Sequence, residues 1–223
     1  MGLFDSLRKA FGGKEVEQAP ASPVEAVVDA PTEGAALEAL GRVISQDDLK
    51  RVVEGAWRHN AVRIAALERI NDEAFLTSWA IKEQVIPVKM RAIDRIANPT
   101  RLLEIWKREK GTPAWREVAL RAESRAAELI GQLDDQDALA QFAGCESTQC
   151  RRAATERIKD KKLLKRVALG GDDIRTDEYQ RRIAISKLDD KGVLRKILER
   201  RNPWDADYKE AEARLAKLDE GEE

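Results

Sequence analysis

Apolar positions recur every three or four residues from residue 37 to about residue 204, with charged positions between them. This spacing predicts a nearly continuous series of amphipathic helices, because residues three and four apart share one face of a helix. Residues 1–11 follow the same rule in one short segment. Residues 12–36 do not follow it. They contain three prolines and three glycines and carry a net charge of −4, so we expect a disordered acidic tether.

The tail at 205–223 carries eight acidic and three basic residues. An apolar stripe of Ala211, Leu215 and Leu218 predicts a helix over residues 208–218. We expect this acidic helix to cap the last repeat, because stacked helical repeats need a polar terminal element.

The helical body at 37–204 is self-similar around a column of anchor residues. Leucine stands four residues after each anchor, and apolar residues stand two and six residues before it and seven after it. Successive anchors are 25 to 37 residues apart, and a period of this size accommodates two short helices and two turns. The body therefore predicts about six two-helix repeats. The anchors are Ser45, in a weaker copy, and Asp72, Asn98, Asp135, Asp160 and Asp190.

The anchor residues are of the types that cap helices. Asp, Asn and Ser side chains accept hydrogen bonds from the first free N–H groups of a helix, so each anchor is expected to be the N-cap of the second helix of its repeat. Asn98 precedes Pro99, which suits the first helical position. The irregular stretch at 107–128 contains Gly-Thr-Pro, and we interpret it as an extended first helix. An inserted extra helix is the alternative.

The repeat units at 62–72, 88–98, 150–160 and 180–190 read VRIAALERIND, VKMRAIDRIAN, CRRAATERIKD and QRRIAISKLDD. They resemble the short HEAT-like repeats of bacterial α-solenoids, most of all the repeat regions of uncharacterised bacterial proteins. The resemblance covers about residues 37–200 and implies an all-α fold, a right-handed α–α superhelix. Such repeats serve as scaffolds, partner-binding arms and, in a few cases, enzymes, so the resemblance indicates architecture more than function.

The composition favours helices and also indicates the cellular compartment. Charged residues make up 36% of the chain, and only 13 Gly and 7 Pro occur in 223 residues, which is typical of long helices washed by solvent. No apolar run approaches the ~18 residues of a membrane span, and no signal peptide is evident. Two cysteines exclude a disulfide scaffold, so we expect a cytoplasmic protein.

The net charge of −1 conceals an uneven distribution. The body at 37–204 carries +7 between acidic flanks, and 17 basic residues face nine acidic ones between residues 151 and 201. Many of these cations occupy outward positions of the second helices, so we expect them to bind a partner. The alternative is a solvated face that keeps the protein soluble. We call this set the basic strip: Lys161, Lys162, Lys165, Arg166, Lys191, Arg195, Lys196, Arg200 and Arg201.

A second column of cations precedes the aliphatic residue two positions before the anchor. Its members stand beside Glu68, Asp94 or Glu156, which favours a row of ion pairs between stacked repeats over a ladder for phosphate groups. The column consists of Arg69, Arg95 and Arg157, with Lys187 in the last copy.

Candidate chemistry is sparse. His59 is the only histidine and has no partner constellation for general base catalysis, so we expect a turn or surface residue. Cys145 and Cys150 are two zinc ligands short of a site, and we expect two reduced thiols. A regulatory disulfide and a metal held between molecules are the alternatives. We therefore expect no catalytic residue, no metal, no cofactor and no small-molecule substrate.

The segment at 1–11 predicts a docking helix, with Leu3, Phe4, Leu7 and Phe11 as its apolar face. A partner groove, a membrane surface and the exposed first repeat of the same chain are all compatible targets.

These observations lead to a functional expectation of a non-enzymatic interaction or scaffold protein, which binds a protein partner through its helical surface. The alternative is a nucleic-acid-binding protein that contacts the phosphate backbone through the basic strip. Peripheral membrane contact through residues 1–11 is compatible with either.

Overall fold

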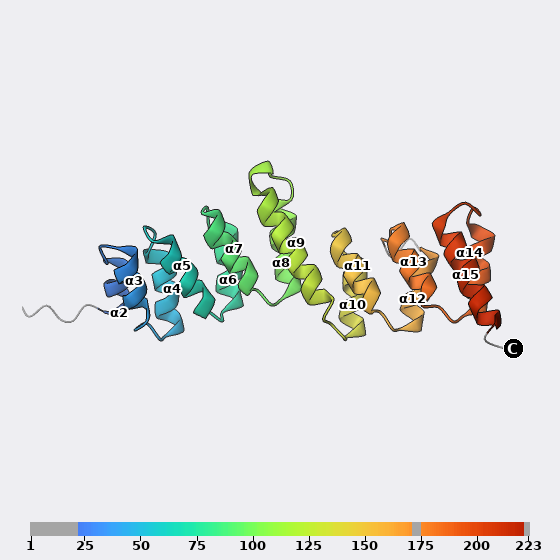
Figure 1. The fold of residues 1–223 in the computed structure, drawn as a ribbon, viewed down its shortest axis with the longest axis horizontal. Helices are drawn as coiled ribbons and strands as arrows, with labels where there is room; N and C mark the ends of the chain where they lie inside the picture. The colour runs from blue at the N-terminus through green and yellow to red at the C-terminus, as the bar shows by residue number, and fades with distance from the viewer. Residues whose placement is uncertain (1–21, 171–174, 221–223) are drawn as a thin grey trace, which may run out of the picture. The chain divides into compact units, whose positions relative to one another are not determined.

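The computed structural model describes residues 22–170 and 175–220. Within these ranges the chain forms fourteen α-helices and one short 3-10 helix, with no β-strand, so the all-α prediction is confirmed (Figure 1). The docking residues Leu3, Phe4, Leu7 and Phe11 lie outside the described residues, as do residues 12–21 of the predicted acidic tether.

The helices divide into two compact units, which meet in the sequence between Asp72 and Glu73. In the first unit α2 packs against α3 and α4, and α5 packs against α3 and α4. Within residues 22–72 this unit contains α2 (Pro23–Val28), α3 (Glu33–Leu40), α4 (Gln46–Gly55) and α5 (Asn60–Arg69).

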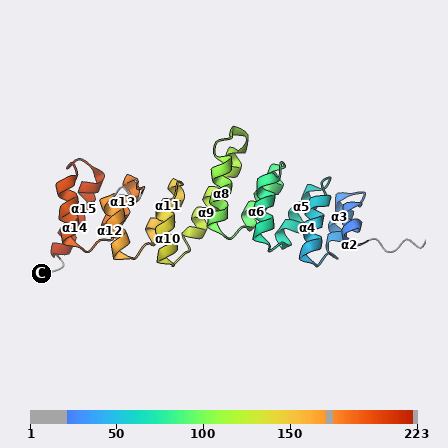
Figure 2. The ribbon, with the colours of Figure 1, turned by 180° about the vertical axis from the view of Figure 1, so that it is seen from behind.

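The second unit contains α6 (Glu73–Lys82), α7 (Ile86–Arg95), α8 (Pro99–Glu109), η1 (Pro113–Trp115), α9 (Arg116–Ile130), α10 (Gln136–Ala143), α11 (Thr148–Arg157), α12 (Lys161–Leu169), α13 (Glu178–Ser186), α14 (Lys191–Arg200) and α15 (Ala206–Glu220). Each helix that follows an anchor packs closely against its successor, as in α6 with α7 and α12 with α13 (Figure 1). The second helices of these pairs then pack in sequence: α7 on α9 (Figure 1), and α9 on α11, α11 on α13 and α13 on α15 (Figure 2).

This packing shifts the boundaries of the repeat unit relative to those predicted from the sequence. The sequence pattern placed each anchor in the middle of a unit, whereas the closely packed helical hairpins run from one anchor to the next. The first hairpin, α2 with α3, also begins at a capping residue, because Ser22 accepts a hydrogen bond from Glu25 N at 3.2 Å. The second helix of the last hairpin is α15, which packs on α13 and α14.

The predicted N-caps are present. Each of the anchors named below stands directly before a helix, and its side chain accepts a hydrogen bond from a backbone N–H two or three residues later. Asp72 directly precedes α6. The capping prediction is confirmed for Ser45, Asn98, Asp135, Asp160 and Asp190.

The predicted disordered tether at 12–36 is wrong for residues 22–36, which contain α2 and the first half of α3. Local chemistry explains the difference. Ser22 and Glu25 form a capping box around Pro23, and proline is pre-organised for the first turn of a helix. Val27 and Ala36 are fully buried, so these short helices have an apolar face to bury against α4 and α5.

The irregular interval is an extended helix, as predicted. A 3-10 turn at Pro113–Trp115 leads directly into α9, which has 15 residues. A buried ion pair lies at this end of the hairpin: Lys89 Nζ on α7 is 2.8 Å from Glu109 Oε1 on α8. The same ammonium lies 4.2 Å from the centre of the Trp115 ring.

Most of the predicted apolar columns are buried, including Leu164 and Leu194. The copy anchored at Asp135 is the exception, because Leu133 and Phe142 are only half-buried. In that copy the extended α9 buries Ala126 and Ile130 instead, which rotates the buried face relative to the other copies.

Candidate functional site

The basic strip occupies two helices of the second unit, α12 and α14, and the residue that follows α14. Its side chains lie on the faces that the apolar columns leave outward, since Leu164, Val167, Leu194 and Ile197 point into the core. The repeat pattern therefore predicted the orientation of the strip correctly.

Three lysines of the strip are neutralised within the molecule. Lys161 pairs with Asp189, Lys165 Nζ is 2.5 Å from Asp190 Oδ2, and Lys191 Nζ is 2.7 Å from Asp219 Oδ1. The first two pairs join α12 to the residues directly before α14 in the next hairpin, and the third joins the start of α14 to the end of α15 within the last hairpin. These pairings were not predicted from the sequence.

Two of these ion pairs shift the pKa values of the groups that form them. Hydrogen bonding to Lys161 holds the pKa of Asp189 below its usual value, and the pKa of Lys161 is raised by the same contact. Lys165 lowers the pKa of Asp190, and the backbone N–H of Val193 lowers it further. Both carboxylates are thus kept ionised by the strip itself.

Four other cations of the strip remain exposed on the surface. None of them makes an ion pair with any residue in 22–170 or 175–220. Arg201 is an intermediate case, with its Nε 3.8 Å from Asp207 Oδ2. The four exposed cations are Lys162 on α12 and Arg195, Lys196 and Arg200 on α14.

The second unit has two cavities at α10, one of which is lined by cations of the strip. One of about 200 Å³ lies between α10 and α12, where Lys162 and Arg166 face Asp137 and Ala140. A larger cavity of about 460 Å³ lies between the start of α8 and α10. Its wall includes Pro99, Ala138 and the half-buried Leu133 and Phe142, so the irregular repeat has left apolar side chains partly uncovered.

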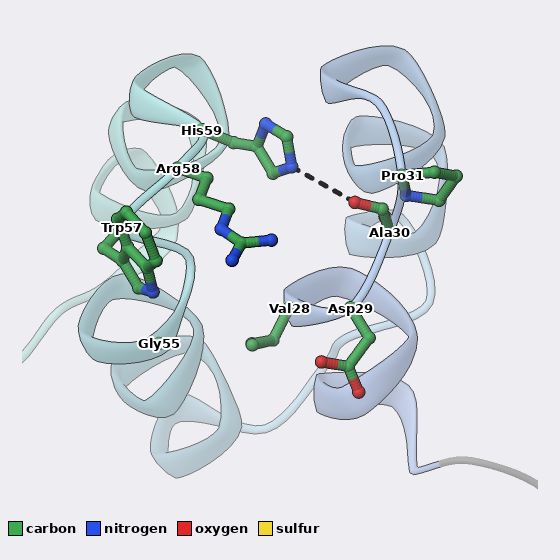
Figure 3. Close-up of a pocket in the computed structure, with 8 residues that line it drawn as sticks. All are labelled: Val28, Asp29, Ala30, Pro31, Gly55, Trp57, Arg58 and His59. Atoms are coloured by element: carbon green, nitrogen blue, oxygen red, sulfur yellow. Dashed lines mark hydrogen bonds between the residues drawn. The ribbon is translucent and has the colours of Figure 1, made fainter.

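A cavity of about 300 Å³ in the first unit lies between the α2–α3 turn and the α4–α5 turn (Figure 3). His59 Nε2 is 3.2 Å from Ala30 O and donates to it, which joins the two turns. The Arg58 side chain extends into the space between them, with its guanidinium carbon 4.8 Å from the centre of the Trp57 ring. Asp29 lines the same cavity as Arg58. The cavity therefore contains charges of both signs, which favour neither an anion nor a cation.

The cation column before the anchors is structural. Arg69 Nη1 donates to Leu40 O at 2.8 Å, and Arg157 Nε donates to Leu133 O at 3.2 Å. Lys187 Nζ donates to Thr155 O at 3.2 Å. The acceptors are carbonyls at or just beyond the C-terminal ends of helices in the preceding hairpin, where cations are favourable. Ion pairing, the predicted role, occurs alongside this in Arg157, whose Nη2 is 2.5 Å from Asp134 Oδ1.

A further cation column was not predicted from the sequence. Nine residues before the anchor, four copies carry a cation on the second helix of a hairpin, and all four are wholly or largely buried. Arg151 Nη1, for example, donates to Cys145 O at 3.0 Å and to Glu146 O at 2.9 Å. The column consists of Arg63, Lys89, Arg151 and Arg181.

The other sequence expectations concern isolated residues. His59 lies at a turn, directly before α5, as predicted. Cys145 and Cys150 are free thiols. Among the described residues no group of three or more His, Cys, Asp or Glu side chains is arranged to hold a metal ion. Within the same ranges, no helix combines the length and apolar character needed to cross a membrane.

No family model, curated protein or solved structure matches this chain.

Proposed function

We propose that the helical hairpins form a HEAT-like right-handed α-solenoid and that the chain is a non-enzymatic interaction module. Its partner is a protein with an exposed acidic segment, which binds across α12 and α14. The observation that carries the proposal is the set of four exposed cations, Lys162, Arg195, Lys196 and Arg200, which make no ion pair within the described residues. Such charges promote association with an oppositely charged partner and set its orientation.

The surroundings of these cations favour a protein over a nucleic acid. Asp189, Asp190 and Glu199 are interspersed with them, and a continuous phosphate backbone would meet these carboxylates. An acidic peptide can place its charges individually and can seat apolar side chains in the cavity lined by Leu133 and Phe142. This second feature supports a partner with both acidic and apolar residues.

Fluorescence anisotropy with labelled poly-L-glutamate and a labelled DNA duplex tests the proposal. Charge reversal at Lys162, Arg195 and Lys196 should weaken polyglutamate binding at least ~10-fold, which is ~1.4 kcal/mol. Reversal of Lys209 and Lys217, exposed on α15, is the matched control and should change little. Equal binding by wild type and the strip variant would refute the proposal. Tighter binding of DNA, with a steeper salt dependence, would favour the nucleic-acid alternative.

A further inference from the structure

The turn between α10 and α11 brings two thiols together. Cys145 is half-buried in this turn, and Cys150, the third residue of α11, is fully buried. Cys145 Sγ is 3.5 Å from Ser147 O, and Cys150 N donates to Ser147 Oγ at 3.2 Å. Both cysteines thus form hydrogen bonds with Ser147, and their thiol side chains interact with each other.

The environment makes the two thiols unequal. The pKa of Cys145 is lowered, chiefly by its hydrogen bond with the Cys150 thiol and also by the backbone at Ser147 and the charge of Arg151. The pKa of Cys150 is raised, by the same interaction with Cys145 and by burial. Cys145 is therefore the more accessible sulfur and the one that carries thiolate character, which is the reactive form.

We propose that Cys145 is an oxidative modification site for hydrogen peroxide and that Cys150 converts the product into an intramolecular disulfide. The Cys145 thiolate attacks one peroxide oxygen, the O–O bond breaks, and the departing hydroxide takes up a proton to leave as water. Cys145 becomes a sulfenic acid, oxidised by two electrons as the peroxide is reduced. The Cys150 sulfur then attacks the Cys145 sulfur, the S–O bond breaks, and the Cys150 proton leaves with the hydroxide as a second water.

The turn is connected to the hairpins on both sides, so its oxidation has structural consequences. Cys150 Sγ donates to Glu123 O on α9 at 3.8 Å, and Ser147 Oγ donates to Glu123 Oε1 at 2.6 Å. On the other side Arg151 Nε donates to Gln180 Oε1 on α13 at 2.9 Å. The disulfide removes the single Cys150 S–H, which is shared between Cys145 and Glu123, so the contact between α9 and α11 is weakened.

Peroxide treatment of the reduced, full-length chain tests the proposal. We expect both free thiols to disappear together, the intact mass to fall by about 2 Da, and dithiothreitol to restore both. In Cys150→Ser, dimedone should trap a sulfenic acid at Cys145, whereas Cys145→Ser should react far more slowly at Cys150. Wild type unfolded in guanidinium is the control, because the difference between the two thiols should vanish with the fold.

Three results would overturn the proposal. In the first, wild type and Cys145→Ser consume peroxide at the same rate. In the second, wild type gains the mass of oxygen at Cys145 without losing the Cys150 thiol. In the third, the disulfide joins two chains, which a non-reducing gel would show. Should either variant fold poorly, brief alkylation of folded wild type with iodoacetamide provides the same comparison, and preferential labelling of Cys150 would also contradict the proposal.

Discussion

A single side chain at an anchor position can cap a helix and also form an ion pair with another hairpin. Asp190 Oδ1 accepts the N–H of Val193 at 3.1 Å, and its Oδ2 receives the Lys165 ammonium at 2.5 Å. In the first unit Lys50 Nζ is 2.8 Å from Oδ2 of another anchor, Asp72. The Asp190 side chain therefore connects two hairpins as well as capping a helix.

Substitution at Asp190 separates these two roles. Asp190→Ala removes the cap and the ion pair and should lower the urea midpoint clearly, whereas Asp190→Asn keeps a capping side chain and should lower it less. Because the folded state lowers the pKa of Asp190, its contribution is present above the unfolded pKa and is lost as pH falls through the folded value. The Asn variant should therefore lose less stability than wild type on acidification from pH 7 to pH 3. Equal loss would show that the pair contributes nothing.

The Lys89–Glu109 pair allows a larger prediction because Lys89 is 1% exposed and Glu109 is 5% exposed. Lys89→Met leaves a buried carboxylate without its partner and should cost about 3–5 kcal/mol in the free energy of unfolding. The double variant Lys89→Met/Glu109→Leu should recover most of this loss, since an apolar pair of similar volume avoids the desolvation penalty. Urea denaturation of the two variants measures both values. A double variant as unstable as the single one would show that the ion pair itself stabilises the fold.

At the level of elements, the sequence predicted helices well and their grouping less well. The anchors and the leucines four residues after them marked the helix starts, because capping and burial both act locally. The phase of the hairpins did not follow from the pattern, since either neighbour of a helix can cover its apolar stripe. The hairpin α2–α3 was missed because Ser22 is followed at the leucine position by Ala26 and at the next apolar position by Asp29.

Limited proteolysis distinguishes the predicted tether from the observed hairpin α2–α3. We expect the stable fragment to begin near Ser22 rather than near Ala36, because Val27 and Ala36 are fully buried. Val27→Asp should open new cleavage sites between residues 22 and 36, since it places a charge in that core. Early cleavage of wild type within 22–36, followed by mass spectrometry of the fragments, would contradict this expectation.

The burial of each leucine in the apolar columns should also determine how much its truncation to alanine lowers the free energy of unfolding. Leu164 is 4% exposed, and Leu164→Ala should cost about 2–5 kcal/mol. Leu133 belongs to another apolar column but borders the cavity of about 460 Å³, so Leu133→Ala should cost less than half as much. Thermal melts of both variants give the comparison. Equal destabilisation would show that the cavity is filled in solution.

Over the whole molecule, the sequence predicted the charge distribution only in part. The excess of cations between residues 151 and 201 is present, but counting charge does not show which cations are already paired. Lys161, Lys165 and Lys191 bind acids that are near in space and 25 to 28 residues away in sequence. The buried cations, such as Arg151, further reduce the charge that a partner can meet.

The tail helix α15 combines these features and gives the last prediction. Asp207 is 2% exposed and binds Arg181 Nε at 2.5 Å, while Asp219 holds Lys191 at the far end of the helix. Deleting residues 205–223 should therefore lower the melting temperature, because α13 and α14 lose their cover and Arg181 loses its acid. It should also delay elution from heparin at low salt, since Lys191 loses the Asp219 carboxylate and a charge of −5 is removed.

Asp219→Asn separates stability from charge in this experiment. It removes the negative charge beside Lys191 without removing the helix, so it should delay elution slightly and leave the melting temperature close to that of wild type. The Lys191–Asp219 pair is partly exposed, and such pairs contribute only ~0–1 kcal/mol. If deletion of the tail leaves both the melting temperature and the elution unchanged, α15 neither covers the last hairpin nor competes for its cations. The acids of the tail would then have no part in controlling access to the basic strip.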